Sequence, residues 1–350
     1  MTRGDTLHER VLVVPHGLGI GDLVNERPLL SAIAAHYKDR EVQVLASPAL
    51  AWLLPPGVQP APALAGVRLW ERPGPNHMLT ALGRGATVRA TGQIAQMAPV
   101  RALVSGLSAY LRLLGYGTVI SLLDRFHHLD LNSRWTEGPW NLERRHLIDL
   151  LADDLERDGV TVSSRRPRLD PEYTHCAVRP DVLITPNAGS MLKEPPVAFW
   201  VTLTRALVAE GRTPWLISAP GRDTAARIAA EVPQAHIMRA ADLRLVAAWI
   251  AAARVVVAPD TGVLHLAAAF GTPYVGLYGA TDPVFLGPYP GTAGTILLTP
   301  AAHEPVCRRC WTGQLLPVVR CPLYQAENCL AGIDPVDVLV AIKEMWAEIA

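Results

Sequence analysis

The sequence has no excess of charge of either sign and no long apolar run. Its 32 basic and 32 acidic residues give a formal net charge of zero, so global charge gives no reason to expect nucleic acid or an anionic membrane as a partner. The longest apolar stretch runs from Leu245 to Ala253 and is much shorter than the roughly 20 residues of a transmembrane helix. The first ten residues contain no apolar segment typical of a signal peptide. We therefore expect a soluble protein of the cytoplasm with no transmembrane segment.

Internal repeats and low-complexity tracts are also absent. The chain has 350 residues, half of them apolar, which is long enough for two domains of ordinary size. Short apolar runs typical of buried strands alternate with helical segments, and this alternation predicts an α/β fold with doubly wound sheets. The segment 163–171 is rich in arginine and proline and is typical of a linker.

A strand, a tight turn and a helix follow one another between Arg254 and Pro283. Val255–Ala258 is a short, β-branched run that predicts a buried parallel strand. The turn at Asp260, Thr261 and Gly262 precedes an alanine-rich helix, so backbone N–H groups and the positive end of a helix dipole should gather there. This pattern predicts an anion site. The alternative is that Asp260 is only a helix cap and Gly262 only a turn residue.

A second glycine-rich turn, beginning at Gly17, follows the first predicted strand, Arg10–Pro15. Its spacing is G-x-G-x-G and not the G-x-G-x-x-G of dinucleotide-binding folds, and no acidic residue ends the predicted strand Glu41–Ala46. An NAD-dependent oxidoreductase is therefore the less favoured interpretation. Asp22 should begin the following helix, either as a functional carboxylate or as a helix cap.

Both turns resemble sequences of the glycosyltransferase family 9 heptosyltransferases. The segment after the buried strand is similar to the family's DTG-x-x-H-x-x-A-A core and its G-x-T-D-P turn, with matches at Asp260, Thr261, Gly262, His265, Ala268, Ala269, Gly279, Thr281, Asp282 and Pro283. The opening segment resembles the family's L-G-D turn and P-L-L helix through Leu18, Gly19, Gly21, Asp22, Pro28, Leu29 and Leu30. Residues 25–27 depart from the small or apolar residues usual there, which puts the acceptor in doubt.

A third segment is typical of a phosphate cradle. The predicted strand Asp181–Thr185 leads into a loop of small residues that ends in a lysine. This loop resembles the family's G-A-S-x-x-K segment through Ser190 and Lys193, although a Glu-Pro-Pro sequence replaces the usual tryptophan after the lysine. Asp223 lies where the family has an acidic residue near the nucleoside.

The resemblance implies a GT-B fold, in which two Rossmann-like domains face each other across a cleft. Residues 1–165 would bind the acceptor, residues 175–333 would bind the nucleotide sugar, and residues 334–350 would form a helix that packs back on the N-terminal domain. The implied enzyme is an inverting glycosyltransferase that moves a heptose or a related sugar from an ADP-activated donor to an acceptor hydroxyl by single displacement. Asp22 would be the general base, and the donor would contact Ser190, Lys193, Asp223, Asp260, Thr261, Gly262 and His265.

The resemblance implies no cofactor for catalysis, and it leaves the acceptor open. A lipopolysaccharide core, a protein hydroxyl and a natural-product scaffold all fit. The remaining alternative is a nucleotide-sugar-binding protein without transferase activity, which would keep the phosphate loops but would not need Asp22.

Two further features carry open alternatives. Four of the five cysteines, Cys307, Cys310, Cys321 and Cys329, lie within 23 residues. In a cytosolic chain this density favours a zinc or iron site over disulfides. The alternative is a set of reduced thiols packed in a small knuckle.

The segment from residue 67 to residue 123 contains six arginines and a single acidic residue. They predict either an electropositive pocket for an anionic acceptor or a solvated surface.

Overall fold

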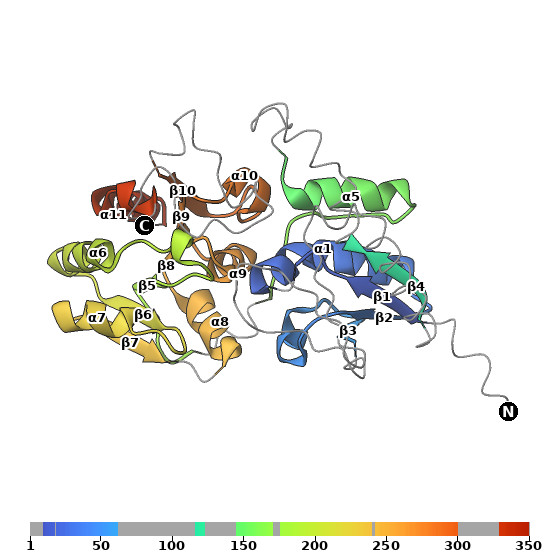
Figure 1. Ribbon diagram of the computed structural model, residues 1–350, viewed down its shortest axis with the longest axis horizontal. Helices are drawn as coiled ribbons and strands as arrows, with labels where there is room; N and C mark the ends of the chain where they lie inside the picture. Colours follow the sequence, from blue (N-terminus) through green and yellow to red (C-terminus); the bar gives the residue numbers. More distant parts are fainter. Residues whose placement is uncertain are drawn as a thin grey trace. The chain divides into compact units, whose positions relative to one another are not determined.

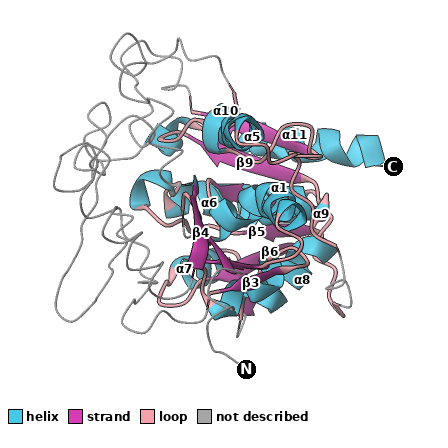
Figure 2. Cartoon of the chain, turned by 90° about the vertical axis from the view of Figure 1, so that its right-hand side faces the viewer, coloured by secondary structure: helices cyan, strands magenta, loops and turns pink. Residues whose placement is uncertain are grey.

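The computed structural model describes residues 10–17, 19–61, 116–122, 145–170, 176–239, 242–299 and 329–349. The chain divides into two compact units, Met1–Pro167 and Arg168–Ala350 (Figure 1). The division falls within the predicted linker 163–171. Each unit is an α/β structure whose helices pack along a parallel sheet (Figure 2).

Unit 1 contains a four-stranded parallel sheet with the strand order β3-β2-β1-β4. Its strands are β1 (Arg10–Val14), β2 (Glu41–Val44), β3 (Val58–Pro60) and β4 (Tyr116–Ser121), and its described helices are α1 (Ile20–His36), the 3-10 helix η2 (Pro48–Leu53) and α5 (Leu147–Arg157). The central strand β1 is apolar along its length, and Val11, Leu12 and Val13 are fully buried. Helices α1 and α5 pack against each other, so the apolar faces of both helices contribute to the core of the unit.

Unit 2 contains a six-stranded parallel sheet with the strand order β10-β9-β8-β5-β6-β7. Its strands are β5 (Val182–Ile184), β6 (Pro214–Ser218), β7 (His236–Arg239), β8 (Val255–Pro259), β9 (Tyr274–Tyr278) and β10 (Gly294–Leu298). Its described helices are η5 (Met191–Lys193), α6 (Val197–Ala209), α7 (Thr224–Glu231), α8 (Leu243–Ala252), α9 (Gly262–Phe270), α10 (Pro283–Leu286), η7 (Cys329–Gly332) and α11 (Pro335–Ile349). Helices α6, α7 and α11 cover one face of the sheet, and α8 and α9 cover the other (Figure 1).

In both sheets, the strands that follow the first strand are added on one side of it and then on the other. In unit 1 the chain steps from β1 to β2 and β3, and β4 then pairs on the other side of β1. Unit 2 repeats this order, with β6 and β7 on one side of β5 and β8 to β10 on the other. Loops at the carboxyl ends of strands diverge where the strand order reverses in this way and leave a crevice, which is where open α/β sheets bind ligands. The predicted doubly wound α/β architecture is confirmed.

Helix α11 packs within unit 2. Its contacts are with α6, β9 and β10, and Val338, Ile342 and Trp346 join the same buried apolar cluster as Trp200 of α6. The guanidinium of Arg212 lies 4.0 Å from the centre of the Trp346 ring. The apolar face of α11 therefore contributes to the core of its own unit, and its packing on the N-terminal domain stays a prediction.

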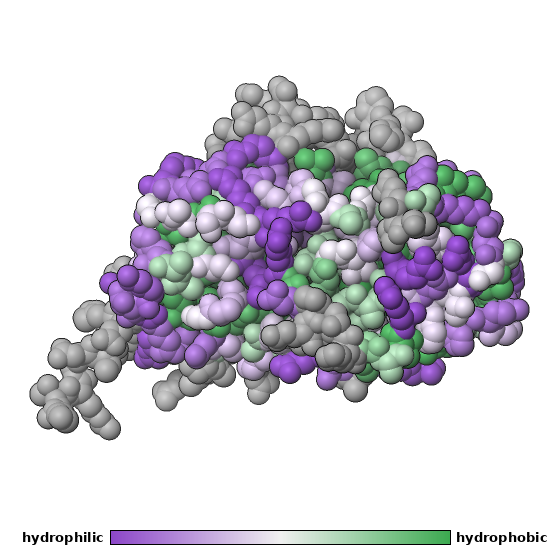
Figure 3. Space-filling view, turned by 180° about the vertical axis from the view of Figure 1, so that it is seen from behind, coloured by the Kyte–Doolittle hydropathy of each residue, from purple (hydrophilic) through white to green (hydrophobic). Residues whose placement is uncertain are grey.

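No helix in the described part of the chain is long and apolar enough to cross a membrane. On the face drawn in Figure 3, hydrophilic and apolar residues are interspersed. Among the described residues, the large apolar side chains that are clearly exposed are Leu245, Val336 and Val340, and single exposures of this kind are normal for a protein surface.

Candidate active site

Asp22 lies in the first turn of α1, directly after the turn that follows β1. Its carboxylate Oδ2 accepts a hydrogen bond of 2.9 Å from the backbone N–H of Gly19, the residue before the helix. The side chain is 29% exposed. Gly19 is the N-cap residue of α1, and Asp22, at the third helical position, accepts the Gly19 N–H through one oxygen. The second oxygen, Oδ1, has a different neighbour.

That neighbour is His16, which the sequence analysis did not select. The His16 Nε2 atom lies 3.6 Å from Asp22 Oδ1, within ion-pair distance. On the other side of the ring, Nδ1 lies 2.5 Å from Glu26 Oε1, and the backbone N–H of His16 donates to the same oxygen at 2.8 Å. Asp22 and Glu26 are four residues apart on one face of α1, so His16 lies between two carboxylates.

The His16–Glu26 pair is almost completely buried, with side-chain exposures of 11% and 0%. Burial alone would lower the pKa of His16, but the hydrogen bond and charge of Glu26, together with the charge of Asp22, raise it to about 9. Burial raises the pKa of Glu26, against the opposing hydrogen bond and charge of His16. The raised pKa of His16 favours an imidazolium that faces Asp22 at neutral pH.

The glycines of this turn are required by the position of Asp22. A side chain at Gly17 would overlap the Asp22 carboxylate, and a Cβ atom at Gly19 would lie 2.9 Å from Asp22 Oδ2. No real Cβ atom tolerates such a contact without a shift of its neighbour. The glycines that resemble a dinucleotide fingerprint in the sequence therefore make room for a carboxylate of the chain itself.

The second group of candidate residues gathers at the carboxyl ends of three neighbouring strands of unit 2. Lys193 follows β5, Asp260 follows β8 and Thr281 follows β9, and these strands are adjacent in the sheet. The Lys193 Nζ atom lies 2.6 Å from Asp260 Oδ2, and the Thr281 hydroxyl donates to the same oxygen at 2.5 Å. The cluster lies between β5 and β8, where the strand order reverses, which is the expected ligand position in this topology.

Asp260 remains charged although it is 8% exposed. Burial tends to raise the pKa of this carboxyl, but the charge and hydrogen bond of Lys193, the hydroxyl of Thr281 and the nearby His265 bring the pKa below its ordinary value. Asp260 is not the cap of α9. That role belongs to Thr261, whose hydroxyl accepts a hydrogen bond of 3.2 Å from the backbone N–H of Val263.

Helix α9 begins at Gly262, next to the Lys193–Asp260 pair. His265 lies one turn further along the helix and is 6% exposed. Backbone N–H groups at the start of a helix and its positive dipole end favour an anion. The lysine, the histidine and the helix start therefore meet at one place, where they can neutralise a diphosphate.

The loop after β5 is tied to the loop after β6. Asn187 donates to the hydroxyl of Thr224, the first residue of α7, at 2.9 Å. Glu194 accepts a hydrogen bond of 2.8 Å from the backbone N–H of Ala188 and pairs with Arg222 in the β6–α7 turn. Glu194 occupies the position of the family's tryptophan, and in this chain it links the two loops.

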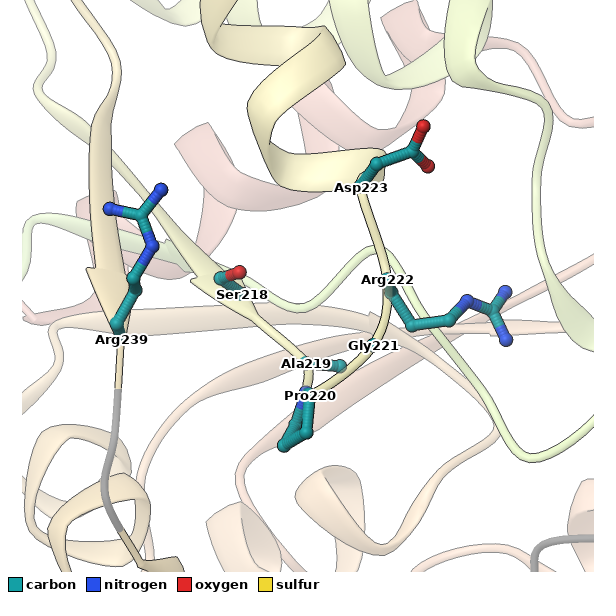
Figure 4. Close-up of a pocket in the computed structure, with 7 residues that line it drawn as sticks. All are labelled: Ser218, Ala219, Pro220, Gly221, Arg222, Asp223 and Arg239. Atoms are coloured by element: carbon teal, nitrogen blue, oxygen red, sulfur yellow. The ribbon is translucent and has the colours of Figure 1, made fainter.

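Asp223 lies apart from the lysine cluster, at a surface pocket. The pocket is lined by Ser218, Ala219, Pro220, Gly221, Arg222, Asp223 and Arg239. Asp223 is exposed and precedes the first residue of α7. Figure 4 shows Arg222 and Arg239 extending on opposite sides of Ser218, with the Asp223 carboxylate directed away from Arg239. The pocket adjoins the carboxyl end of β6, one strand from β5.

The structure thus brings some of the selected residues into contact and leaves others at separate positions. Lys193 and Asp260 touch, and Thr261, Gly262 and His265 belong to the adjoining helix start. The hydroxyl of Ser190 accepts a hydrogen bond of 3.3 Å from the backbone N–H of Leu192 and so shapes the turn that presents Lys193. Sequence reasoning missed His16 and Glu26, although Glu26 had been noted as a departure from the family pattern.

The cysteine cluster lies outside the described residues, as do the side chain of Cys329 and most of the arginine-rich segment 67–123. Within the described residues, no group of histidine, cysteine, aspartate or glutamate side chains is arranged to hold a metal ion. The metal site at Cys307, Cys310, Cys321 and Cys329 stays a prediction.

The chain is similar to known proteins in sequence and in fold. Residues 143–313 match the model of glycosyltransferase family 9 (heptosyltransferase). Lipopolysaccharide heptosyltransferase 1 of Pseudomonas aeruginosa is 40% identical over 97 residues, which are 27% of this chain and 27% of that protein. The aligned stretch thus spans about a quarter of the length of this curated relative.

Two solved structures share the fold over nearly the whole chain. A family 9 glycosyl transferase from Veillonella parvula superposes with a TM-score of 0.59 at 15% identity, covering 97% of this chain and 98% of its own. E. coli heptosyltransferase WaaC with ADP-2-deoxy-2-fluoro heptose gives a TM-score of 0.54 at 19% identity, with coverages of 97% and 100%. Likenesses at this identity show the fold, which is the GT-B fold of the heptosyltransferases. In sequence, residues 143–313 are similar to glycosyltransferase family 9.

Proposed function

We propose that the chain is an inverting glycosyltransferase that moves a heptose or a related sugar from an ADP-activated donor to an acceptor hydroxyl. The observation that carries this proposal is the cluster of Lys193, Asp260 and Thr281 at the strand-order reversal of unit 2. Open α/β sheets bind nucleotides at this position. The match to the heptosyltransferase family and the ADP-heptose analogue in the E. coli relative support the choice of donor.

The diphosphate of the donor would lie at the start of α9, beside Lys193. An ammonium group has three N–H donors, so its ion pair with Asp260 is compatible with a contact to a phosphate oxygen. Asp260 and Thr281 hold the lysine in place, and the amides at Gly262 supply further donors. Charge that develops on the departing diphosphate would be stabilised by these fixed groups, and the proposed chemistry requires no cofactor.

Asp22 would be the general base. Inversion at the anomeric carbon by a single displacement requires a base for the acceptor proton on the face opposite the leaving group, as in inverting glycosidases, with the acceptor hydroxyl in place of water. The bond from the acceptor oxygen to the anomeric carbon forms as the bond to the diphosphate breaks, and the acceptor proton passes to Asp22. The carboxylate is partly exposed and fixed by Gly19, which suits this role.

Asp223 and its pocket would bind the nucleoside, because a carboxylate can accept hydrogen bonds from ribose hydroxyls. The pocket lies after β6, beside the strand that leads to Lys193. Ser190 would support the diphosphate loop. The acceptor, whether a lipopolysaccharide core, a protein hydroxyl or a natural-product scaffold, would be bound by the N-terminal unit.

Two measurements test this function. Thermal unfolding with ADP, UDP, GDP and NAD should show the largest stabilisation with ADP, because a ligand that binds the native state raises the unfolding temperature. Release of ADP from ADP-heptose should then depend on an acceptor from one of the three classes. Stabilisation by ADP without acceptor-dependent release would favour a nucleotide-sugar-binding protein, and stabilisation by NAD alone would contradict the proposal.

A further inference from the structure

Packing within unit 1 does not explain why a carboxylate is buried at position 26. Its Oε1 atom contacts the backbone N–H and Nδ1 of His16, while its Oε2 atom is buried without a hydrogen-bond partner in the described structure. A buried, half-satisfied carboxylate is costly. Apart from Asn25, the other buried residues of α1, such as Leu23, Leu29 and Leu30, are apolar, and an apolar residue at position 26 would pack there at a lower cost.

The direction of the contacts suggests what Glu26 does. It binds the nitrogen of His16 that points away from Asp22, and Nε2, on the opposite side of the ring, faces Asp22 Oδ1 at 3.6 Å. The charged groups that face the ring from the described residues are Glu26 and Asp22, both on α1. Among the described residues, the contact of Asp22 that would remain without the ring is the hydrogen bond from Gly19 to its other oxygen, Oδ2.

We propose that His16 is a positioning residue for Asp22 and that the buried Glu26 holds the His16 ring in place and in its charged form. This role rests on the proposed function, in which Asp22 takes the acceptor proton. The imidazolium would fix the direction of the Asp22 carboxylate while leaving it partly exposed to the acceptor. His16, Glu26 and Asp22 all belong to unit 1. His16 and Glu26 lie outside the motifs that resemble the family.

The pKa of the His16 ring tests the role of Glu26 in a measurement that does not depend on catalysis. Nitrogen-15 NMR of the full chain, with His16 assigned by its loss in the H16Q variant, should give a His16 pKa of about 9 in the wild type. E26Q keeps the shape of the side chain and removes its charge, so burial should dominate and the His16 pKa should fall by more than about one unit. D22N should lower it by less, because Asp22 is the smaller contributor.

Kinetics separate a positioning role from a purely structural one. H16Q and E26Q should lower kcat by about 10- to 100-fold, the scale of small misplacements of a reacting group, with an unchanged Kd for ADP. In the wild type, kcat should fall as pH rises through about 9, and in E26Q this fall should begin at a lower pH. E41Q, which removes an exposed glutamate from the start of β2 of the same unit, should behave as the wild type in both respects.

The failures of the two proposals are distinguishable. A wild-type protein that transfers no sugar to any acceptor class overturns the function. An active wild type whose H16Q and E26Q variants keep both kcat and its pH profile overturns only the positioning role. A His16 that titrates near 6.5 in wild type and E26Q alike would overturn the role of Glu26.

Discussion

Glu26 of unit 1 and Asp260 of unit 2 are both buried carboxylates at the end of a parallel sheet, yet their pKa values move in opposite directions. The Asp260 oxygen contacts an ammonium and a hydroxyl, and its pKa falls below the ordinary value. Glu26 has one imidazole partner and one unsatisfied oxygen, and its pKa rises. Burial tends to raise the pKa of both acids, so their opposite shifts follow from the number and charge of their partners.

The two units also place different side chains at the same position of a shared topology. Both sheets reverse their strand order beside the first strand, and both place candidate residues in the loop after that strand. In unit 1 this loop leads into α1, whose first turn carries a carboxylate, Asp22, that we propose as the base. In unit 2 it presents a lysine beside a helix start that is suited to hold a diphosphate. If Asp22 takes the acceptor proton and Lys193 holds the diphosphate, variants of one site should leave the function of the other intact.

Asp22→Asn should give the largest effect on catalysis. The amide keeps the shape of the side chain and its hydrogen bond from Gly19, but it cannot accept a proton as a base. Transfer should fall by about 100-fold or more, the usual scale for removal of a general base, while the ADP affinity stays unchanged. D39N, which alters an exposed aspartate of the same unit, is the matched control. Wild-type turnover in D22N would leave Asp22 with its capping role alone.

Gly17→Ala should displace the Asp22 side chain, because it adds a methyl group to the neighbouring backbone. The added methyl group would overlap the Asp22 carboxylate, so the side chain must move. A displacement of about 1 Å in a reacting group can cost up to about 100-fold in rate, and we expect a loss of kcat that approaches this value. G159A is a suitable comparison for stability, because Gly159 has a positive φ of 87° but no atom within 4 Å of a built Cβ. If G17A reduced stability as G159A does and left kcat unchanged, the close approach would have no catalytic consequence.

Lys193→Ala should weaken donor binding. A hydrogen bond to a charged group contributes about 1.5–3 kcal/mol, so the Kd for ADP should rise by about 10- to 150-fold. The variant also leaves Asp260 without its cation, so its unfolding temperature should fall. Lys343, which pairs with Glu210 at 2.7 Å on the surface, provides the control, because K343A should change stability by less than about 1 kcal/mol and leave ADP binding unaffected.

The opposite pKa shifts of the two sites should make the free energy of unfolding fall at alkaline pH because of His16 and Glu26, and at acid pH because of Asp260. The raised pKa of His16 means that its stabilisation is fully present below pH 6.5 and is lost as pH rises through about 9. Glu26, whose pKa is also raised, adds a decline that begins above 4.5. Asp260 contributes stability that is present above 3.8 and lost as pH falls through its lowered pKa.

Urea unfolding of the wild type, E26Q and D260N from pH 3 to pH 10 checks these signs. E26Q should lose the alkaline decline and keep the acid one, and D260N should do the reverse. Unchanged alkaline behaviour in E26Q would mean that His16 and Glu26 do not act as a charged pair in solution.

Much of unit 2 could be predicted from the sequence, because its signals are local. The β-branched run Val255–Ala258 is buried in β8, and the turn at Thr261 and Gly262 begins α9 as expected. What the sequence did not reveal is that Lys193 and Asp260 contact each other, because these residues are 67 positions apart (260 − 193) and their contact depends on β5 and β8 being neighbours in the sheet.

The His16–Glu26 pair could not be predicted for a different reason. A lone histidine in a turn and a glutamate in a helix carry no spacing signal, and their contact depends on the path of the loop between β1 and α1. The one available indication was that Glu26 stands where the family has small or apolar residues. A charged residue on the buried side of an otherwise apolar helix face predicts a polar partner, and that signal could have led to His16.

The measurement that tests the account most directly is the ADP affinity and the transfer rate of D22N and K193A, determined side by side. We expect D22N to bind ADP as the wild type does and to lose transfer by about 100-fold or more. We also expect K193A to bind ADP more weakly by about 10-fold or more. A D22N variant that retains transfer, or a K193A variant that retains wild-type ADP affinity, would contradict the assignment of the base to unit 1 and of the donor site to unit 2.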